Sequence, residues 1–272
     1  MEPIDTFLKK MNEDLDYKIP VNALISFIDP DTGKFLCKLA ADFIKSQTSR
    51  STLTVLHFID EDKAVEIGDI EYYKNDFYSD IVELYEKEQL LIRIFIQVST
   101  DYVADIAEMK EKYTCNLLLI GVEHEAFSSF WEEDYLRLKN SVADSITMAI
   151  FDNHGFQQLN RIFVPIVDKT DVYVFLFINR LIVHEKVFIM IWDAIGIIES
   201  EPEMKKLYQY LYKKSEGRLT LWNNDKKIGN DYIAEHDLVL IGAEGWKKLT
   251  SSAVSWAHSL PSTFIVKPAT NE

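Results

Sequence analysis

The chain has 272 residues, of which 47% are hydrophobic and 27% charged, so it can bury one large core or two of ordinary size. Its formal net charge of -15 excludes a general nucleic-acid binder, which would carry a basic face. No apolar run reaches the ~18–20 residues that a membrane span needs, and no signal peptide is recognisable, so neither membrane insertion nor export is expected.

The first half of the chain alternates short apolar runs with amphipathic segments. Apolar and β-branched runs predict strands at 23–29, 52–60, 90–98, 117–121 and 146–151. Helical spacing of apolar residues, or a capping residue before them, predicts helices at 31–47, 70–88, 101–113 and from 132 onward. Near-continuous apolar strands that alternate with helices predict a parallel sheet covered on both faces.

The second half repeats this order with shorter connections. Strands are predicted at 161–168, 186–193, 218–223, 238–242 and 262–267, with helical segments between them. Asp29 and Asp168 end the two first strands, and Gly121 and Gly242 end the two fourth strands. We therefore expect an α/β chain with two tandem domains, 1–155 and 156–272, each an open parallel five-stranded sheet flanked by helices.

The two halves differ strongly in charge. Residues 1–160 hold 15 Lys and Arg against 30 Asp and Glu, whereas residues 161–272 hold 14 of each kind. The ordinary interpretation of the acidic half is a solvated surface, and the sharper one is repulsion of anionic ligands. The last strand of each half, ITMAIF (146–151) and STFIVK (262–267), would be an apolar sheet edge, so we expect these two strands to pair within the chain.

Several stretches resemble the universal stress protein family: ALISFIDPDTGKFLCKLA, TLTVLHFID, NLLLIG and NSVADS. The resemblance implies an adenine nucleotide alpha hydrolase-like fold with the strand order 3-2-1-4-5 in each domain. More narrowly, ISFIDPDTGKFLCKLA, STDYVADIAE, RIFVPIVD and LVLIGAEGWKKL resemble the cytosolic C-terminal region of Bacteroidetes-type monovalent cation:proton antiporters. That resemblance implies a membrane transporter domain, in the same polypeptide or complex, as the partner, and homodimer contacts as a further role.

The ATP-binding members of the family carry Gly-x2-Gly-x9-Gly-Ser/Thr after the fourth strand, which lets backbone N–H groups surround phosphates. In the first domain Asp29 and Gly121 match, but His124 replaces the second glycine. Ser141 matches the serine after a longer spacer, with Asn140 in place of the third glycine. The loop between them also holds five carboxylates, which oppose a polyanion: Glu123, Glu125, Glu132, Glu133 and Asp134. We call the region where the ends of the first and fourth strands meet the corner of a domain. The corner of the first domain is therefore interpreted as a degenerate nucleotide-binding site.

The second domain keeps more of the pattern. Gly242 and Gly245 have the required spacing, Ser251 and Ser252 follow after a short spacer, and Asp168 would lie near the ribose by analogy. The alternative is a turn that needs glycine and a capped helix, with no ligand. We expect ATP to bind weakly or not at all, and any small ligand to bind at this second corner.

Other chemistry has weak support in the sequence. No two of the six histidines have metal-ligand spacing, and no nucleophile motif occurs, so neither a metal site nor catalytic residues are predicted. His57 lies in a strand pattern and is interpreted as a core histidine. His124, between two glutamates, would be either an ordinary loop residue or a group that responds to pH. The acidic loop could in principle hold a hard cation, although a solvated loop is the usual outcome.

We therefore expect a non-catalytic regulatory or sensor domain of a cation:proton antiporter on the cytosolic side of the membrane. Cys37 and Cys115 lie in apolar segments, which fits a reducing cytoplasm. The alternative is a free-standing tandem universal stress protein that binds ATP or another adenine nucleotide. A nucleotide-hydrolysing enzyme is the weakest reading, because no general base stands in a recognisable setting.

Overall fold

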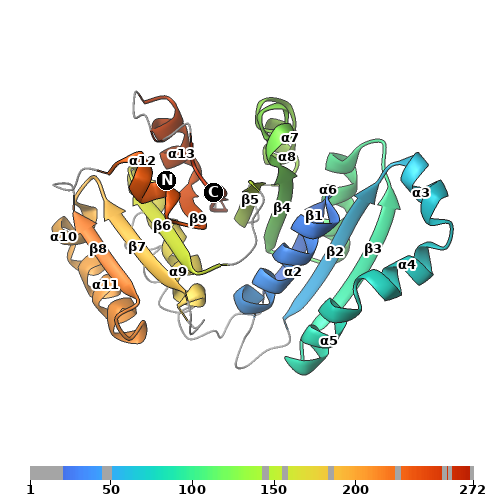
Figure 1. Cartoon of the computed structure of the whole chain (residues 1–272), viewed down its shortest axis with the longest axis horizontal. Coiled ribbons are helices and arrows are strands. Elements are labelled where there is room, and N and C mark those ends of the chain that lie inside the picture. Colours follow the sequence, from blue (N-terminus) through green and yellow to red (C-terminus); the bar gives the residue numbers. More distant parts are fainter. Residues whose placement is uncertain are drawn as a thin grey trace. The chain divides into compact units, whose positions relative to one another are not determined.

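The computed structural model shows strands and helices alternating along the chain (Figure 1). It describes residues 21–44, 51–142, 147–154, 159–182, 187–223, 228–252, 256 and 259–269. The chain divides into two compact units: among the described residues, those up to Asp152 together with 268 and 269 form the first, and Asn153–Lys267 form the second. The domain limits expected from the sequence, at residues 155 and 156, lie outside the described residues.

The first unit is built on five strands. They are β1 (Asn22–Phe27), β2 (Thr52–Ile59), β3 (Leu91–Val98), β4 (Leu117–Glu123) and β5 (Thr147–Asn153). The helical elements are α2 (Pro30–Ile44), α3 (Glu61–Ile67), α4 (Ile70–Phe77), α5 (Ser79–Lys87), α6 (Tyr102–Lys112), α7 (His124–Ser129), the π-helical turn η1 (Phe130–Asp134) and α8 (Tyr135–Val142). Strands β1 and β2 are buried almost throughout, which explains their continuous apolar sequences.

Helices cover the sheet of the first unit on both faces (Figure 1). Helix α2 packs on β1, β2 and β4 and contacts α5, whereas α6 packs against α8. Crossovers between parallel strands are right-handed. The strand order reverses once within the sheet, so the helices on the two sides of this reversal pack on opposite faces.

Aspartates begin three helices of the first unit. The side chains of Asp60, Asp69 and Asp101 accept hydrogen bonds from the third residue of α3, α4 and α6, with N–O distances of 2.6, 2.9 and 3.3 Å. Such N-caps satisfy N–H groups that have no partner within the helix. The helix start predicted at residue 101 is confirmed.

The helix predicted at 70–88 is interrupted at Tyr78. This residue separates α4 from α5, and its fully buried hydroxyl lies 2.9 Å from Nδ1 of His57. The His57 ring stacks on Phe27, with centroids 5.1 Å apart, and burial lowers the pKa of His57 to about 4. His57 is thus a neutral, hydrogen-bonded core histidine, and the sequence-based interpretation is confirmed.

The second unit repeats the order with shorter helices. Its strands are β6 (Arg161–Ile166), β7 (Phe188–Asp193), β8 (Leu219–Asn223), β9 (Leu238–Gly242) and β10 (Ser262–Lys267). Its helical elements are the 3-10 turn η2 (Lys169–Val174), α9 (Phe175–Leu181), α10 (Ile197–Ser200), α11 (Pro202–Lys214), α12 (Asn230–Ala234) and α13 (Ala243–Thr250). All strand pairs with a described register, in both units, are parallel.

The strands form one ten-stranded sheet in the order β3-β2-β1-β4-β5-β10-β9-β6-β7-β8. Each unit keeps the expected order of third, second, first, fourth and fifth strand, but the expectation of two separate five-stranded sheets is wrong. Strands β5 and β10 are neighbours in this order. The physical reason is that an apolar edge strand exposes unpaired N–H and C=O groups, which favours pairing.

The buried contact between Tyr78 and His57 gives a test of the first core. We expect Tyr78→Phe to lower the free energy of unfolding by about 1–2 kcal/mol, because a buried hydrogen-bonding group loses its partner. Tyr72→Phe is the matched control, since Tyr72 is 71% exposed and should change stability little. Urea denaturation of the three proteins measures this, and equal stability of the two variants would contradict the assignment.

Candidate functional site

Parallel pairing of the first strand with the fourth creates one candidate corner in each unit. Strand β1 pairs with β4 from Ala23 opposite Leu117 to Ser26 opposite Ile120, and β6 pairs with β9 at Ile162 and Phe163. In each unit, the loop after the first strand therefore meets the segment after the fourth strand. Ligands of open α/β sheets bind at such carboxyl ends, where strand order reverses.

Asp168 lies at the second-unit corner and begins η2. Its Oδ1 accepts hydrogen bonds from the backbone N–H of Thr170 at 2.9 Å and from the Thr170 hydroxyl at 2.7 Å. Its Oδ2 forms an ion pair with the ammonium of Lys248. These contacts hold the pKa of Asp168 below its usual range, although partial burial acts in the opposite direction. Asp168 is thus engaged within the chain on both carboxylate oxygens.

Asp171 occupies the centre of this corner and was not among the residues predicted from the sequence. Its side chain is fully buried, and Oδ2 accepts hydrogen bonds from the backbone N–H groups of Val167 and Asp168, at 2.9 and 2.8 Å. The other oxygen, Oδ1, accepts from the N–H of Gly245 at 3.1 Å. One carboxylate therefore joins the end of the first strand to the first turn of α13.

The two glycines of the second corner are explained by this carboxylate. A Cβ atom on Gly242 would lie 2.3 Å from Oδ1 of Asp171, and a Cβ on Gly245 would lie 2.2 Å from Oδ2. Both distances are far shorter than van der Waals contact, so any larger residue would displace Asp171. The Gly-x2-Gly spacing gives the backbone room for a carboxylate of the chain itself.

The electrostatics of Asp171 are dominated by burial. Desolvation raises the pKa of Asp171 to about 7, and the negative charge of Asp168 acts in the same direction. The three backbone N–H groups favour the ionised form and lower the pKa. The charged groups at this corner include Asp168 before η2, and Lys248 and Glu244 on α13.

Ser251 and Ser252 lie at the far end of the helix that begins at the corner. Helix α13 starts directly after Gly242 and ends at Thr250. Ser251 caps this end, and its hydroxyl donates to the carbonyl of Lys248 at 3.2 Å. The Ser252 hydroxyl donates to the carbonyl of Leu249 at 2.6 Å. Eight helical residues extend ~12 Å, so the structure does not bring these serines to the glycines.

The first-unit corner has the same backbone plan with different side chains. Oδ2 of Asp29 accepts from the N–H of Thr32 at 2.7 Å, and Thr32 is buried. A Cβ on Gly121 would lie 2.6 Å from the Thr32 methyl carbon, so Gly121 makes room for Thr32. Ser141 lies in the last turn of α8, where its hydroxyl donates to the carbonyl of Arg137 at 2.9 Å. Asp29 and Gly121 belong to one corner, and Ser141 lies a helix away.

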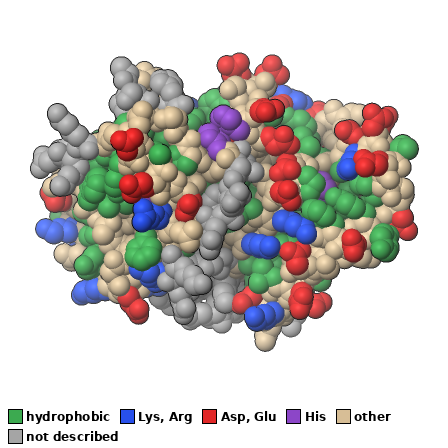
Figure 2. Space-filling view, viewed as in Figure 1, with side chains coloured by type: hydrophobic (Ala, Val, Ile, Leu, Met, Phe, Trp, Pro, Cys, Tyr) green, Lys and Arg blue, Asp and Glu red, His purple; other side chains and the backbone are tan. Residues whose placement is uncertain are grey.

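The acidic loop after Gly121 is largely helical. Of its five carboxylates, four are exposed and Asp134 is half-buried, where it accepts a short hydrogen bond from Tyr102. Arg137 lies 3.3 Å from Asp134 and binds both oxygens of Asp101, at 2.8 and 2.9 Å. Figure 2 shows acidic side chains gathered over the first unit.

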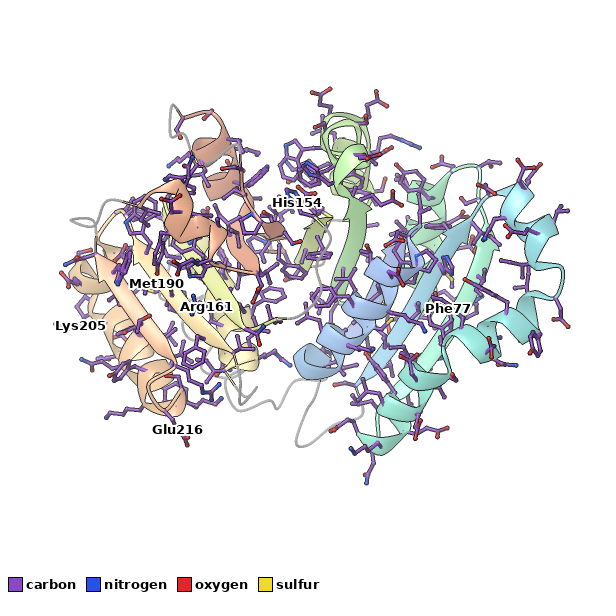
Figure 3. All side chains as sticks on the ribbon, viewed as in Figure 1. Phe77, His154, Arg161, Met190, Lys205 and Glu216 are labelled. Atoms are coloured by element: carbon purple, nitrogen blue, oxygen red, sulfur yellow. The ribbon has the colours of Figure 1, made fainter. Side chains whose placement is uncertain are left out.

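His124 has a neighbour that the sequence did not indicate. Its Nδ1 lies 3.2 Å from Oδ1 of the buried Asp152, 28 residues later. His154, labelled in Figure 3, follows Asp152 by two residues, and the three side chains offer ligand atoms within 4.8 Å of one another. Sequence spacing predicted no metal ligands among the histidines, because their approach depends on the pairing of strands.

Asp171 had a signal in the sequence that was not used. It follows the strand-ending Asp168 by three residues, which is the spacing of a capping box, and the structure shows both hydrogen bonds of that motif. The spacing indicates a capped turn, but it does not indicate a bond to Gly245, 74 residues away.

The clash at Gly245 provides a test of how tightly the corner is filled. We expect Gly245→Ala to destabilise the protein by about 1–3 kcal/mol, since the added methyl must displace a buried carboxylate. In an Asp171→Ala background the same change should cost little, because its obstacle is gone. Urea unfolding of the wild type, the two single variants and the double variant measures the coupling energy between Gly245 and Asp171. Additive changes in the free energy of unfolding would show that Asp171 does not fill this space.

The raised pKa of Asp171 predicts a pH dependence of stability. A carboxyl group that titrates near 7 in the folded state and near its ordinary value when unfolded binds protons more readily in the folded state. Its contribution to stability is therefore present below about pH 4 and is lost as the pH rises to about 7. We expect Asp171→Asn to remove this contribution, so that the difference in unfolding free energy between wild type and variant changes across the window. A pH-independent difference would contradict the prediction.

Comparison with known proteins gives a likeness of fold. The chain is similar to the crystal structure of the cytoplasmic domain of a prokaryotic cation chloride cotransporter, with 13% identity, a TM-score of 0.57, and coverage of 93% of this chain and 98% of that chain. It is also similar to a universal stress protein from Archaeoglobus fulgidus DSM 4304, with 14% identity, a TM-score of 0.47, and coverage of 95% and 100%. No protein-family model matches the sequence, and no curated protein matches it. The resemblance expected from the sequence is confirmed for the fold.

Proposed function

We propose that this chain is a non-catalytic regulatory domain of a cation transporter, located on the cytosolic side of the membrane. The observation that carries the proposal is the likeness to a transporter's cytoplasmic domain, which extends over 93% of this chain and 98% of the other. None of the described helices has the length and apolar character to cross a membrane. The transporter itself would be the membrane domain of the same polypeptide or of the same complex.

The finer assignment to a cation:proton antiporter rests on the sequence stretches quoted above. The non-catalytic assignment has support in the two corners. Asp168 and Asp171 are held by hydrogen bonds and an ion pair within the chain, and Asp29 caps the turn before Thr32. A general base or a nucleophile needs a face that is open to substrate, whereas these side chains stabilise turns.

The acidic surface of the first unit supports a basic partner. Helices α3 and α4 have no buried residue among them, and they expose five carboxylates: Glu61, Asp62, Glu66, Glu71 and Asp76. The carboxylate of Asp69, which caps α4, is exposed as well. Val65 and Tyr72 on the same two helices are 82% and 71% exposed. Cytoplasmic loops of membrane proteins carry an excess of Lys and Arg, so they are complementary to this surface. Contacts of this kind steer association and weaken as salt is added.

Cross-linking in native cells tests the proposal. We expect the chain in the membrane fraction, joined to a cation transporter with several spans, either covalently in one polypeptide or through cross-links that mass spectrometry identifies. Free occurrence in the soluble fraction, without cross-links to a transporter and with tightly bound adenine nucleotide, would instead support a free-standing stress protein.

A charge variant locates the contact. Neutralising Glu61→Gln, Asp62→Asn and Asp76→Asn together should reduce cross-links to the transporter several-fold, because the attraction to basic loops is weakened. The matched control removes the same number of exposed charges from the second unit, through Glu199→Gln, Glu216→Gln and Asp231→Asn. Equal recovery from both triple variants would contradict a docking role for α3 and α4.

A further inference from the structure

The corner of the second unit is already occupied by a carboxylate of the chain itself, that of Asp171. Phosphate-binding loops hold their ligand with converging backbone N–H groups and glycines that allow close approach. At this corner the N–H groups of Val167, Asp168 and Gly245 converge on the side chain of Asp171, within 2.8 to 3.1 Å. We propose that the Asp171 carboxylate is an internal ligand, which occupies the place of an external phosphate or carboxylate and keeps such anions out.

The steric evidence is independent of the hydrogen bonds. Cβ atoms built on Gly242 and Gly245 meet the Asp171 carboxylate first, at 2.3 and 2.2 Å. The volume next to the two glycines is thus filled by the carboxylate, and an external oxyanion could enter only if Asp171 left. The glycines therefore serve the internal ligand.

The surrounding charges lead to the same conclusion. Lys247 and Lys248 are the cations on α13, and each is paired with a carboxylate of the same unit, Glu244 and Asp168. An incoming anion would have to compete with these ion pairs as well as with Asp171. The hydroxyls of the two serines lie at the other end of α13 and donate to backbone carbonyls.

The first unit supplies an internal comparison. Thr32 follows Asp29 by three residues, as Asp171 follows Asp168, and it fills the space beside Gly121 with a methyl group. Both units thus close their corner with the residue three positions after the aspartate that follows the first strand. Only the second unit closes it with a carboxylate that backbone N–H groups bind.

Chemical rescue tests the proposal. In Asp171→Ala the three N–H groups lose their acceptor, and a small cavity of carboxylate size is opened. We expect sodium formate to raise the thermal unfolding midpoint of this variant by about 4 °C, relative to sodium chloride of equal ionic strength, when formate is present at roughly ten times its dissociation constant. Inorganic phosphate should raise the midpoint less. The wild type and Asp171→Asn, whose corners remain filled, should respond equally to the three salts.

Two results would overturn the proposal. The first is that formate raises the thermal midpoint of Asp171→Ala no more than that of the wild type. If this variant is unfolded in chloride, the equivalent result is that formate recovers no folded protein. The second needs no variant. Titration of the wild type with inorganic phosphate or ATP, followed by backbone amide signals, should leave Val167, Asp168 and Gly245 unshifted, and shifts clustered at these residues would show that the corner is open. This outcome is independent of whether a transporter is the partner.

Discussion

The parallel pairing of the first with the fourth strand is the constraint on which both units depend. Strands β1 and β4, and likewise β6 and β9, are buried and joined in register, so their carboxyl ends stand side by side. The loop after the first strand then meets the helix that follows the fourth. Everything at the two corners, including which glycines are required, follows from this proximity.

The same backbone plan is filled in two ways. In the first unit a threonine methyl lies against Gly121, and in the second a buried carboxylate lies against Gly242 and Gly245. A methyl group needs only contact, whereas a buried carboxylate needs donors, which the backbone of Val167, Asp168 and Gly245 supplies. A glycine at either corner therefore indicates close packing, and the side chain next to it decides whether a ligand has room.

The two units also differ in charge. The acidic residues are concentrated in residues 1–160, and helices α3 and α4 present them without burying any residue of their own. The second unit has no net charge over residues 161–272 and holds its charged corner residues in internal pairs. The exposed acidic charge therefore belongs to the first unit.

The sequence by itself determined the order of strands and helices in each unit and the buried role of His57. These features depend on local signals, namely continuous apolar runs, aspartates at helix starts and glycines after strands, which act within a few residues. The same signals identified Asp168, Gly242 and Gly245 as neighbours through the topology of a parallel sheet.

Only the tertiary structure decided what fills each corner. Asp171 reaches Gly245 across 74 residues, His124 reaches Asp152 across 28, and Tyr78 interrupts a helix to meet His57. Ser251 is close to Gly245 in sequence but lies at the opposite end of α13, because Gly245 is in the first turn of this helix and Ser251 caps its last turn. The joining of all ten strands in one sheet is likewise a property of the folded chain. Contacts between distant segments depend on how the sheet aligns them, and no local pattern encodes that alignment.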